Sequence, residues 1–384
     1  MSVTHDKKTM KILHVITGLN DGGAEGVLNR ICLFDTGKGF VHHVVCLSGV
    51  GKYSAVLESA GIKVYHLRIK SFRNFLSAIW KFKRVLIDIN PDVIQTWMYH
   101  SDLFGGIFGR LFGCETVIWN IRQTELSSAY VKKSTIWLAK FAALLSHIVP
   151  LKTICCGDRS KSFHVQFGYD ESKMIVIGNG LNLNSTGEIL SIDQIRRDRE
   201  DLTIGPREFA IGMVGRFDPV KNHRGLLEAL SELRHLSFKL LLIGEGLSSE
   251  NQELCEWIMQ NNLSKKVLLM GQRADVFRHY QLMDIHVLPS HSEGFPNVVI
   301  EAMAVGTPCI VTDAGDAAII VKDTGWVVPV GNKELLKIAL QDAMEECLND
   351  YQQFENRKLA CIQEVREHYT LNTMVNKYHQ AWLN

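Results

Sequence analysis

The sequence predicts an α/β fold made of two Rossmann-like domains. Each domain is expected to have a doubly wound parallel sheet, and the two are expected to face each other across a cleft. The chain has 384 residues, which is long for one hydrophobic core and natural for two domains of somewhat under about 200 residues each. Short β-rich runs alternate with helical segments in two separate series, a pattern typical of parallel sheets with helices between the strands. A polar, charge-rich stretch, residues 182–206, separates the two series.

The first series is expected to form a domain over residues 1–190. Helical segments such as Glu25–Phe34 and Ser101–Phe112 separate short runs rich in β-branched and aromatic residues. The strands predicted from these runs are Lys11–Ile16, His43–Leu47, Val64–Leu67, Val93–Trp97, Thr116–Trp119, Thr153–Cys155 and Met174–Ile177.

The second series is expected to form a domain over residues 207–368, after an inter-domain linker at residues 191–206. Its predicted strands are Phe209–Val214, Lys239–Ile243, Lys266–Leu268, Ile285–Leu288 and Pro308–Val311. The tail, residues 369–384, is helical in pattern and carries Tyr378 and Trp382. We expect these aromatic side chains to pack back on the first domain.

The composition excludes several protein classes. Hydrophobic residues make up 46% of the chain and charged residues 22%, which is a globular composition. The nine cysteines lack CxxC or Cys/His spacing, which argues against a zinc site, and their odd number argues against a full disulfide framework. A reducing compartment, the cytoplasm, is expected. The N-terminus is a poor signal peptide, and no apolar run of about 18 residues predicts a transmembrane helix.

The two halves of the chain differ in charge. Residues 1–190 contain 22 Lys and Arg against 14 Asp and Glu, whereas the remainder contains 20 against 27. The first half is therefore basic and the second acidic, although the whole chain has a net charge of +1. A basic half is compatible with nucleic acid, an anionic membrane or an acidic substrate, and the positions of the charges must decide among these.

The most informative segment is SHSEGFPNVVIEAMAVGTPCIVTD, residues 290–313, which places Glu293 in a Gly/Pro loop and Glu301 in the helix that follows. Asn297 is expected to cap that helix, whose apolar run is Val298–Val305. The helix N-terminus attracts a phosphate, and Glu301, one turn in, accepts hydrogen bonds from hydroxyl groups. A ligand with both a phosphate and a polyol fits this polarity.

Two cations follow the first strand of the second domain. The sequence GRFDPVKNH places Arg216 and Lys221 just past the strand's C-terminal end, where open α/β sheets bind ligands. The pair could clamp a diphosphate in place of a metal ion. Taken alone, one Arg and one Lys are more often solvated surface charges, but the nearby glutamate loop favours the clamp.

A glycine turn follows the first strand of the chain. In GLNDGGAE, residues 18–25, Gly22 and Gly23 leave the backbone free to approach a phosphate or sugar closely. The alternative is tight packing of strand against helix. The turn lacks the GxGxxG spacing of dinucleotide-binding folds, and neither a Walker A sequence nor a protein-kinase motif set is present.

Together, these motifs resemble glycosyltransferase family 4, retaining enzymes with the GT-B fold, of the bacterial surface polysaccharide and lipopolysaccharide type. The resemblance rests on the Gly-Gly-Ala-Glu turn, GRFDPVKN, IGEG at 243–246, Gly271 with Asp275, the SEGFPNVVIEAMAVGTPCIVTDAG run and IGNGLN at 177–182. It covers essentially the whole chain in the expected order. One departure is Asn182, where the family often has Asp.

The resemblance implies roles for the residues of these motifs. Arg216 and Lys221 would bind the nucleotide diphosphate, Glu301 the ribose hydroxyls and Glu293 the donor sugar. The amides of Gly294, Phe295 and Asn297 would complete the phosphate site. Gly244 and Arg273 are further substrate-binding candidates. No cofactor and no metal are implied, in agreement with the lack of a convincing DxD motif.

In the first domain, His100 follows a predicted strand and resembles the family's active-site histidine, with a role toward donor sugar or acceptor. A histidine beside aromatic residues is otherwise more often structural. Asn120 and Arg122 follow the next strand, at an equivalent edge, and are weaker candidates for contact with the acceptor.

Two basic segments of the first half interleave aromatic and cationic residues. They are residues 70–86, with Lys81, Lys83 and Arg84, and residues 130–152, with three lysines on an apolar-rich helix. Such helices can lie in the interface of an anionic bilayer. The alternative is that their apolar residues pack on the sheet and the basic ones form a solvated face. Nucleic acid is disfavoured, because no RNA- or DNA-binding motif is recognisable.

The sequence thus predicts a metal-independent, retaining glycosyltransferase that takes a nucleotide-sugar, with UDP favoured over GDP, and a glycan or lipid-linked acceptor. We expect it in the cytoplasm, with peripheral membrane association as a hypothesis. Two alternatives remain open: a nucleotide-sugar epimerase of the same fold, and a catalytically silent subunit that binds nucleotide-sugar or polysaccharide.

Overall fold

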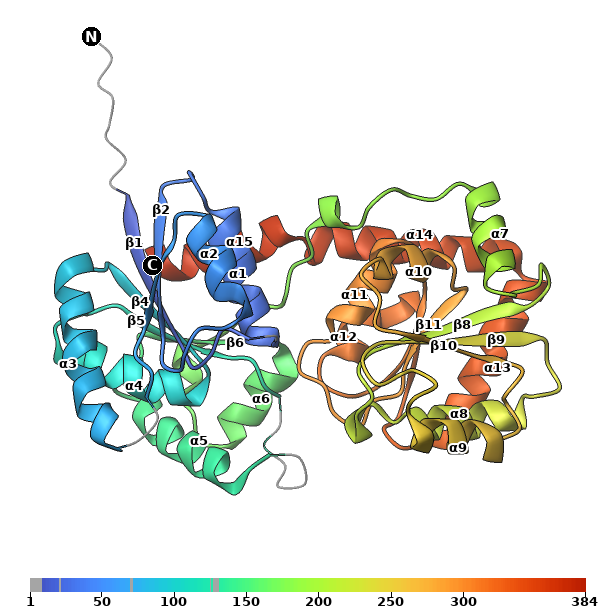
Figure 1. Cartoon of the computed structure of the whole chain (residues 1–384), viewed down its shortest axis with the longest axis horizontal. Coiled ribbons are helices and arrows are strands. Elements are labelled where there is room, and N and C mark those ends of the chain that lie inside the picture. Colours follow the sequence, from blue (N-terminus) through green and yellow to red (C-terminus); the bar gives the residue numbers. More distant parts are fainter. Residues whose placement is uncertain (1–8, 21, 70–71, 125, 127–130) are drawn as a thin grey trace, which may run out of the picture. The chain divides into compact units, whose positions relative to one another are not determined.

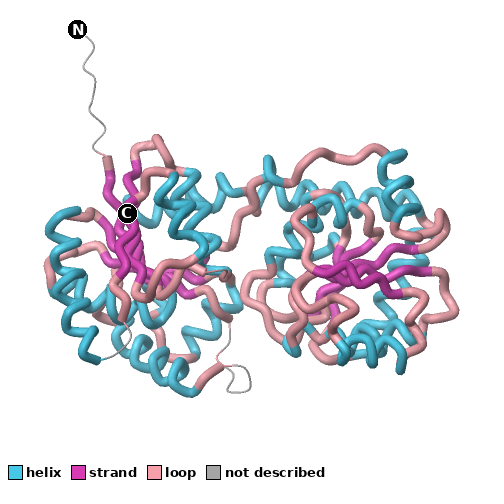
Figure 2. The backbone as a smooth tube through the Cα atoms, in the orientation of Figure 1, coloured by secondary structure: helices cyan, strands magenta, loops and turns pink. Residues whose placement is uncertain are grey.

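The computed structural model describes residues 9–20, 22–69, 72–124, 126 and 131–384. Asp21 of the glycine turn, and Lys70 and Tyr130, where the two basic segments begin, lie outside the described residues. The chain divides into two compact units (Figures 1 and 2): unit 1 comprises residues 1–179 and 374–384, and unit 2 comprises residues 180–373. No described helix is both long enough and apolar enough to span a bilayer.

Unit 1 is built on a parallel sheet in the order β3-β2-β1-β4-β5-β6-β7. Its strands are β1 (Met10–Ile16), β2 (Phe40–Cys46), β3 (Lys63–His66), β4 (Val93–Trp97), β5 (Val117–Ile121), β6 (Lys152–Cys155) and β7 (Met174–Val176). Its helices are α1 (Gly23–Phe34), α2 (Lys52–Ser59), α3 (Phe72–Ile89), α4 (Met98–Leu111), α5 (Lys133–Ser146), α6 (Asp158–Gln166) and α15 (Leu371–Leu383).

The strand order of unit 1 decides which face each helix covers. From β1 the chain steps one way to β2 and β3, and from β3 onward it steps the other way through β4, β5, β6 and β7. Because crossovers between parallel strands are right-handed, helices α1 and α2 cover one face and α3 to α6 the other. Figure 1 shows α3, α4 and α5 side by side on that second face.

The C-terminal helix α15 packs on unit 1 through polar contacts with three different elements. The Asn120 amide donates to the Tyr378 hydroxyl (2.8 Å), and the Trp382 indole N–H donates to Gln95 (3.0 Å). His379 Nε2 lies 2.9 Å from both carboxylate oxygens of Asp35, which is fully buried. The last segment of the chain is therefore part of the first folding unit.

Unit 2 has a second parallel sheet, in the order β10-β9-β8-β11-β12-β13. Its strands are β8 (Phe209–Val214), β9 (Phe238–Ile243), β10 (Val267–Gly271), β11 (Ile285–Leu288), β12 (Cys309–Thr312) and β13 (Trp326–Val328). Its helices are α7 (Ile192–Asp201), α8 (His223–Glu232), α9 (Gln252–Gln260), α10 (Val276–Gln281), α11 (Asn297–Ala304), α12 (Ala317–Val321), α13 (Lys333–Asn349) and α14 (Tyr351–His368).

Both faces of this second sheet are buried. Alternate residues of β8 and β9 belong to two separate core clusters, with Ile211 and Leu240 in one and Ala210 and Leu241 in the other. Burial on both faces is typical of parallel sheets, which explains why these strands are near-continuous apolar runs in the sequence. The predicted α/β class with two parallel sheets is confirmed.

The chain reverses its direction of winding between β8 and β11, and ligands of such folds bind at this switch point.

The predicted linker, residues 191–206, is instead part of unit 2 and contains helix α7. Ser191 and Gln194 form a capping box at its start. Arg199 bonds the carbonyl of Leu282 (3.0 Å) and the carboxylate of Asp284 (2.7 Å). The stretch was polar because α7 lies on the surface of the unit, and the boundary between the units falls after Asn179.

Two buried histidines hold neighbouring elements together in their neutral form. His286 in β11 accepts a hydrogen bond at Nε2 from the backbone N–H of Val214 at the end of β8 (3.3 Å), and burial lowers its pKa to about 3. His164 in α6 lies 2.7 Å from the Tyr99 hydroxyl, and burial lowers its pKa to about 4. Each imidazole therefore stays uncharged in the folded protein under mildly acidic conditions.

These lowered pKa values predict loss of stability in acid. As pH falls below about 6.5, the unfolded chain takes up protons on these imidazoles and the folded chain does not, down to about 4 for His164 and about 3 for His286. Each group then contributes a slope of up to about 1.4 kcal/mol per pH unit. We expect the free energy of unfolding in urea to fall from pH 7 to pH 5.

The variant His164→Gln should have a shallower pH dependence than the wild type over this window, whatever its stability at pH 7. His235→Gln, which changes an exposed histidine, is the matched control. An identical slope in His164→Gln and the wild type would contradict the assignment of this imidazole.

Candidate functional site

The site in unit 2 begins where β8 ends. Every residue of β8 is buried, and the side chain of Arg216, two residues later, is 66% exposed. Its guanidinium contacts the Asp218 carboxylate at 2.9–3.0 Å. Partial burial opposes ionisation of Asp218, but the N–H of Val220 and the charge of Arg216 lower its pKa overall. Asp218 thus holds Arg216 at the C-terminal edge of the sheet.

Lys221 connects this loop to the loop that follows β11. Its Nζ lies 2.6 Å from Oε1 of Glu293, and the two side chains are only 17% and 11% exposed. The Ser290 hydroxyl donates to the same oxygen, also at 2.6 Å. Among the residues that the structure describes, the second oxygen, Oε2, accepts no hydrogen bond. Glu293 therefore fixes Lys221 with one oxygen and can bind a hydroxyl group with the other.

Asn222 stabilises the same junction through an unusual backbone conformation. Its φ is +56°, in the left-handed region that asparagine tolerates better than most residues. The side chain caps α8 by accepting from the N–H of Gly225 (3.1 Å) and donates to the carbonyl of Pro289 (3.1 Å). One residue thus sets the start of α8 and its distance from the end of β11.

The Glu293 loop is also held from β12. The Thr312 hydroxyl donates to the carbonyl of Ser290 (2.6 Å), and the N–H of Asp316 bonds the carbonyl of Gly294 (3.2 Å). Gly315 has φ +54°, and a Cβ at this position would overlap the carbonyl oxygen of Glu293. Only a glycine lets the two loops approach this closely.

Helix α11 follows the loop and carries Glu301. The predicted cap is wrong: Asn297 is the first helical residue, and Pro296, which has no side-chain cap, is the N-cap. The backbone N–H groups of the first turn therefore start without a side-chain acceptor at the N-cap. Glu301 Oε2 accepts a hydrogen bond from the hydroxyl of Tyr280 (3.2 Å). Burial and the charge of Glu301 raise the pKa of Tyr280 well above its usual range, so the phenol remains a donor.

The loops after β9 and β10 complete this edge. Gly244 has φ +147°, and a Cβ there would overlap the carbonyl oxygen of Gly215, the residue before Arg216. Arg273 is exposed on the loop after β10. The ring of Phe295 lies 5.8 Å from that of Tyr369. The structure thus brings Arg216, Lys221, Gly244, Glu293 and the start of α11 together at one end of the sheet.

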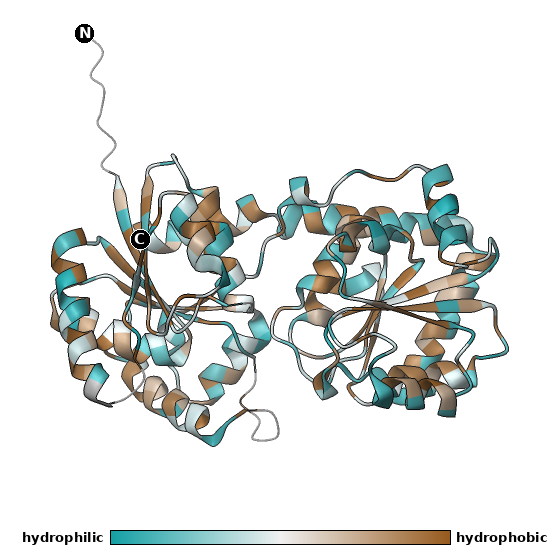
Figure 3. Ribbon diagram, viewed as in Figure 1, coloured by the Kyte–Doolittle hydropathy of each residue, from teal (hydrophilic) through white to brown (hydrophobic). Residues whose placement is uncertain are grey.

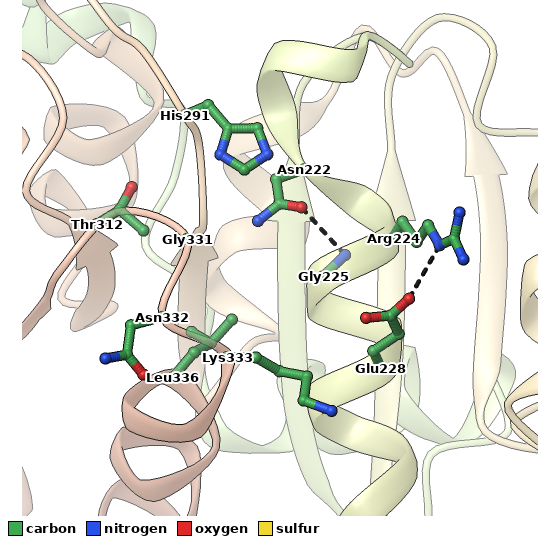
Figure 4. A pocket seen from close by; sticks show the side chains of 10 residues that line it. All are labelled: Asn222, Arg224, Gly225, Glu228, His291, Thr312, Gly331, Asn332, Lys333 and Leu336. Atoms are coloured by element: carbon green, nitrogen blue, oxygen red, sulfur yellow. Dashed lines mark hydrogen bonds and ion pairs between the residues drawn. The ribbon is translucent and has the colours of Figure 1, made fainter.

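A cavity of about 270 Å³ opens beside the loop that carries Glu293 (Figure 4). It lies between the N-terminal ends of α8 and α13, and His291 and Thr312 contribute to its wall. In Figure 4 the side chain of Arg224 points to Glu228, with which it forms an ion pair at 2.9 Å. The donor residues predicted from the sequence do not line this cavity.

The candidates in unit 1 lie at the C-terminal end of its sheet. Gly22 is the N-cap of α1 and Gly23 its first residue, and a Cβ on Gly23 would meet nothing within 4 Å. His100 is exposed in the first turn of α4, which directly follows β4 as the sequence predicts for this residue. Thr17 and Ser101 lie 3.1 Å apart through their hydroxyl oxygens, which joins the end of β1 to this turn.

A strained backbone residue precedes His100. Met98 has φ +70° although it carries a side chain, and its sulfur lies 3.2 Å from the backbone nitrogen of Arg122. Conformations of this kind cost about 1–3 kcal/mol and persist where the surrounding structure enforces them. The sharp turn from β4 into α4 places His100 at the sheet edge.

Asn120 has a different position from the one predicted, whereas Arg122 directly follows β5, at the expected end of the strand. Asn120 is fully buried in β5 and bonds Tyr378 of the C-terminal helix. Arg122 donates to the carbonyl of Ile177 (3.3 Å) and to the Tyr378 hydroxyl (3.4 Å). The burial and contacts of Asn120 assign it to anchoring α15 rather than to contacting an acceptor.

The sequence motifs did not predict several residues that support the site. Asp218, Ser290, Tyr280 and Gly315 each orient a predicted residue or its loop. Ser290 is the first residue of the segment that carries the glutamates, and Gly315 lies two residues beyond its end, so their position was a usable signal. Tyr280 had none, because its contact with Glu301 depends on how α10 packs against α11.

One group of metal-ligand side chains occurs among the described residues, in unit 1. His14, Cys32 and His42 are buried and lie close together. His14 Nε2 and His42 Nδ1 are already hydrogen-bonded at 2.9 Å, and burial raises the pKa of the Cys32 thiol. These contacts make the group part of the core rather than a ready ligand set.

The sequence of the chain is similar to those of known glycosyltransferases. Residues 21–185 match the family described as Glycosyltransferase Family 4, and residues 194–359 match Glycosyl transferases group 1. The Escherichia coli UDP-Gal:alpha-D-GlcNAc-diphosphoundecaprenol alpha-1,3-galactosyltransferase is 27% identical over 60% of each chain. The Campylobacter jejuni N-acetylgalactosamine-N,N'-diacetylbacillosaminyl-diphospho-undecaprenol 4-alpha-N-acetylgalactosaminyltransferase is 28% identical over 69% of this chain and 70% of that one.

A solved structure supports the fold. The crystal structure of Anabaena HepE in complex with UDP superposes with a TM-score of 0.84 at 21% identity, covering 97% of this chain and 99% of that chain. The two family matches together account for most of both units. The chain therefore belongs to the GT-B glycosyltransferases, with a family 4 region in its N-terminal half and a group 1 region in its C-terminal half.

Proposed function

We propose that this glycosyltransferase moves a sugar from a nucleotide-sugar to a glycan or lipid-linked acceptor with retention of anomeric configuration and without a metal ion. The observation that carries the proposal is the Lys221–Glu293 pair at 2.6 Å, beside Arg216 and the N-terminus of α11. This places cations, backbone N–H groups and a carboxylate at one sheet edge. Cations and backbone N–H groups suit a diphosphate, and a carboxylate suits the hydroxyl groups of the attached sugar.

The chemistry follows from charge development. When the bond between the sugar and the diphosphate breaks, negative charge grows on the leaving oxygen, and fixed cations stabilise it where it forms. Arg216 and Lys221 would supply this charge, with the backbone N–H groups of Gly294, Phe295 and Asn297 as further donors. Glu301 would bind the ribose hydroxyls, with its carboxylate oriented by Tyr280.

Glu293 would orient the donor sugar rather than act as a base. Its Oε1 is engaged by Lys221 and Ser290, so the carboxylate is held in place while Oε2 can accept from a sugar hydroxyl. Retention would then arise from front-face attack, in which the leaving phosphate helps to deprotonate the acceptor hydroxyl. His100 would contact the donor sugar or the acceptor.

The donor is proposed to be a UDP-sugar, with a GDP-sugar as the second choice. The support comes from the relatives: the Escherichia coli enzyme is named for UDP-Gal, and the Anabaena structure is a complex with UDP. The two relatives named above act on diphospho-undecaprenol-linked sugars, which supports a lipid-linked or polysaccharide acceptor. A cytoplasmic location would follow from such a donor.

The clamp is tested by removing each of its two cations. Lys221→Ala and Arg216→Ala should each lower kcat/KM by about two or more decades, because each removes a charge-assisted contact to the leaving group. Steady-state release of nucleoside diphosphate measures the effect. Arg224→Ala is the control, since it removes an exposed arginine of the neighbouring helix that pairs with Glu228. Near-wild-type turnover in Lys221→Ala would refute the clamp.

The donor is tested by thermal shift against UDP-, GDP-, ADP- and TDP-sugars. We expect the largest rise in Tm with UDP-sugars, and we expect binding and turnover to persist in EDTA, since protein cations take the place of a metal. Loss of turnover in EDTA would contradict the metal-independent mechanism. Interconversion of donor sugars without acceptor would instead identify an epimerase, and binding without turnover across the panel would identify a silent subunit.

The loop geometry is tested with a pair of glycines. Gly315→Ala and Gly331→Ala both put a side chain at positive φ (+54° and +72°), which costs about 1 kcal/mol. Only at position 315 does the new Cβ overlap the backbone of Glu293, whereas at position 331 nothing lies within 4 Å. We expect Gly315→Ala to lose at least about tenfold in kcat/KM and Gly331→Ala to keep it. Equal activities would show that the position of the loop does not matter.

A further inference from the structure

Helix α5 of unit 1 exposes a continuous apolar ridge. Trp137, Phe141 and Leu144, with Ile148 just beyond the helix, are 72%, 51%, 66% and 72% exposed. Their spacing of four, three and four residues places them on one side of the helix. Single exposed apolar residues are ordinary on a protein surface, but four large ones in a row indicate a surface that contacts something apolar.

The charged residues of the segment that carries the ridge have one sign. Residues 131–152 contain four lysines and no aspartate or glutamate. Lys132, Lys133 and Lys140 are exposed, and Lys140 Nζ lies 5.4 Å from the centre of the Trp137 ring. The ridge is thus bordered by cations with long, flexible stems, which can keep their charge in water while apolar neighbours enter a less polar phase.

A second helix of this face, α3, repeats the pattern on the other side of α4. Helix α3, on the same face of the sheet, exposes Leu76, Trp80 and Ile87, and the Arg84 guanidinium stacks on the Trp80 ring at 3.7 Å. Figure 3 shows apolar residues on α3 and α5 alternating with polar ones along this layer. The alternative stated above was that the apolar residues of these two segments pack on the sheet. It does not hold for the exposed apolar residues of α3 and α5.

We propose that the α5 ridge docks on the surface of an anionic lipid bilayer, with Trp137 and Phe141 entering the interface and the lysines contacting lipid headgroups. Amphipathic helices with aromatic residues on one side and lysines at the border bind such interfaces. A second copy of the chain fits less well, because two such faces would bring lysines against lysines with no carboxylate from this segment between them.

The surface has a place in the proposed function, on which this part of the inference rests. Helix α5 starts beyond the C-terminal end of β5, at the sheet edge where His100 lies after β4. A lipid-linked acceptor in the same bilayer would then be presented at this edge.

The test uses the full chain and vesicles of phosphatidylglycerol and phosphatidylcholine. Wild type should co-sediment with the anionic vesicles, less at high ionic strength and less with pure phosphatidylcholine. Trp137→Ser with Phe141→Ser should lower the partition coefficient about tenfold or more, and Lys133→Glu with Lys140→Glu should also weaken binding. The control is Leu348→Ser with Leu359→Ser, which alters equally exposed residues of α13 and α14 near glutamates.

A position-specific measurement accompanies this test. Brominated lipids should quench part of the tryptophan fluorescence, and Trp137→Phe should remove that part. Unchanged vesicle binding in the Ser or Glu double variants would overturn the proposal. It would also be overturned if the wild type ignored vesicles and light scattering showed a dimer that Trp137→Ser with Phe141→Ser converts to monomer.

Turnover separates the two proposals. Donor hydrolysis, or transfer to a soluble acceptor, should be unchanged in the α5 variants, because none of the altered residues belongs to the donor site. Loss of vesicle binding with full turnover would support the docking surface alone. A wild type that binds vesicles but turns over no nucleotide-sugar would contradict the proposed function and leave the surface standing.

Discussion

The C-terminal edge of the unit 2 sheet depends on the ion pair between Lys221 and Glu293. The two residues are 72 positions apart in the chain and belong to loops that follow the neighbouring strands β8 and β11. Both side chains are largely buried, so removing either one leaves a charge with little solvent to stabilise it. The pair therefore fixes both loops, and with them Arg216 and the start of α11.

The backbone around this pair is as specific as the side chains. Asn222 takes a left-handed conformation to cap α8 and reach the carbonyl of Pro289, and Gly315 leaves room for the carbonyl of Glu293. Neither residue contacts a charged group of the pair. They set the separation of the strand-end loops, and a separation that is fixed in advance needs no rearrangement when a charged ligand binds.

The elements that the sequence predicted best are those buried on both faces. Phe209–Val214, Ile285–Leu288 and Val93–Trp97 have the predicted bounds, because a fully buried strand must be apolar throughout. The strand Trp326–Val328 was missed, since three residues carry no periodicity. Polar surface alone also did not distinguish α7 from a linker, although its Ser191–Gln194 capping box was present in the sequence.

For the candidate site, the sequence likewise predicted some residues and not others. Motif residues such as Arg216 and Glu293 could be chosen because each lies in a loop that follows a strand, and Glu301 because it lies one turn into the helix after that loop. Their partners could not be, since a contact such as that of Tyr280 with Glu301 is fixed by tertiary packing. The same reason explains Asn120: its partner Tyr378 lies 258 residues away, on a helix whose position the local pattern does not encode.

The cations of the two units work over different distances. Arg216 and Lys221 belong to the acidic part of the chain, and each is paired with a nearby carboxylate, Asp218 or Glu293. Their charge is therefore felt mainly at contact range, where in the proposed mechanism it would act on a leaving group. Lys133 and Lys140 are exposed on a segment without carboxylates, so their field extends about a Debye length into solvent and is screened by salt. The excess positive charge of the first half thus suits attraction to an extended anionic surface, whereas the proposed recognition of the donor would depend on a few fixed charges.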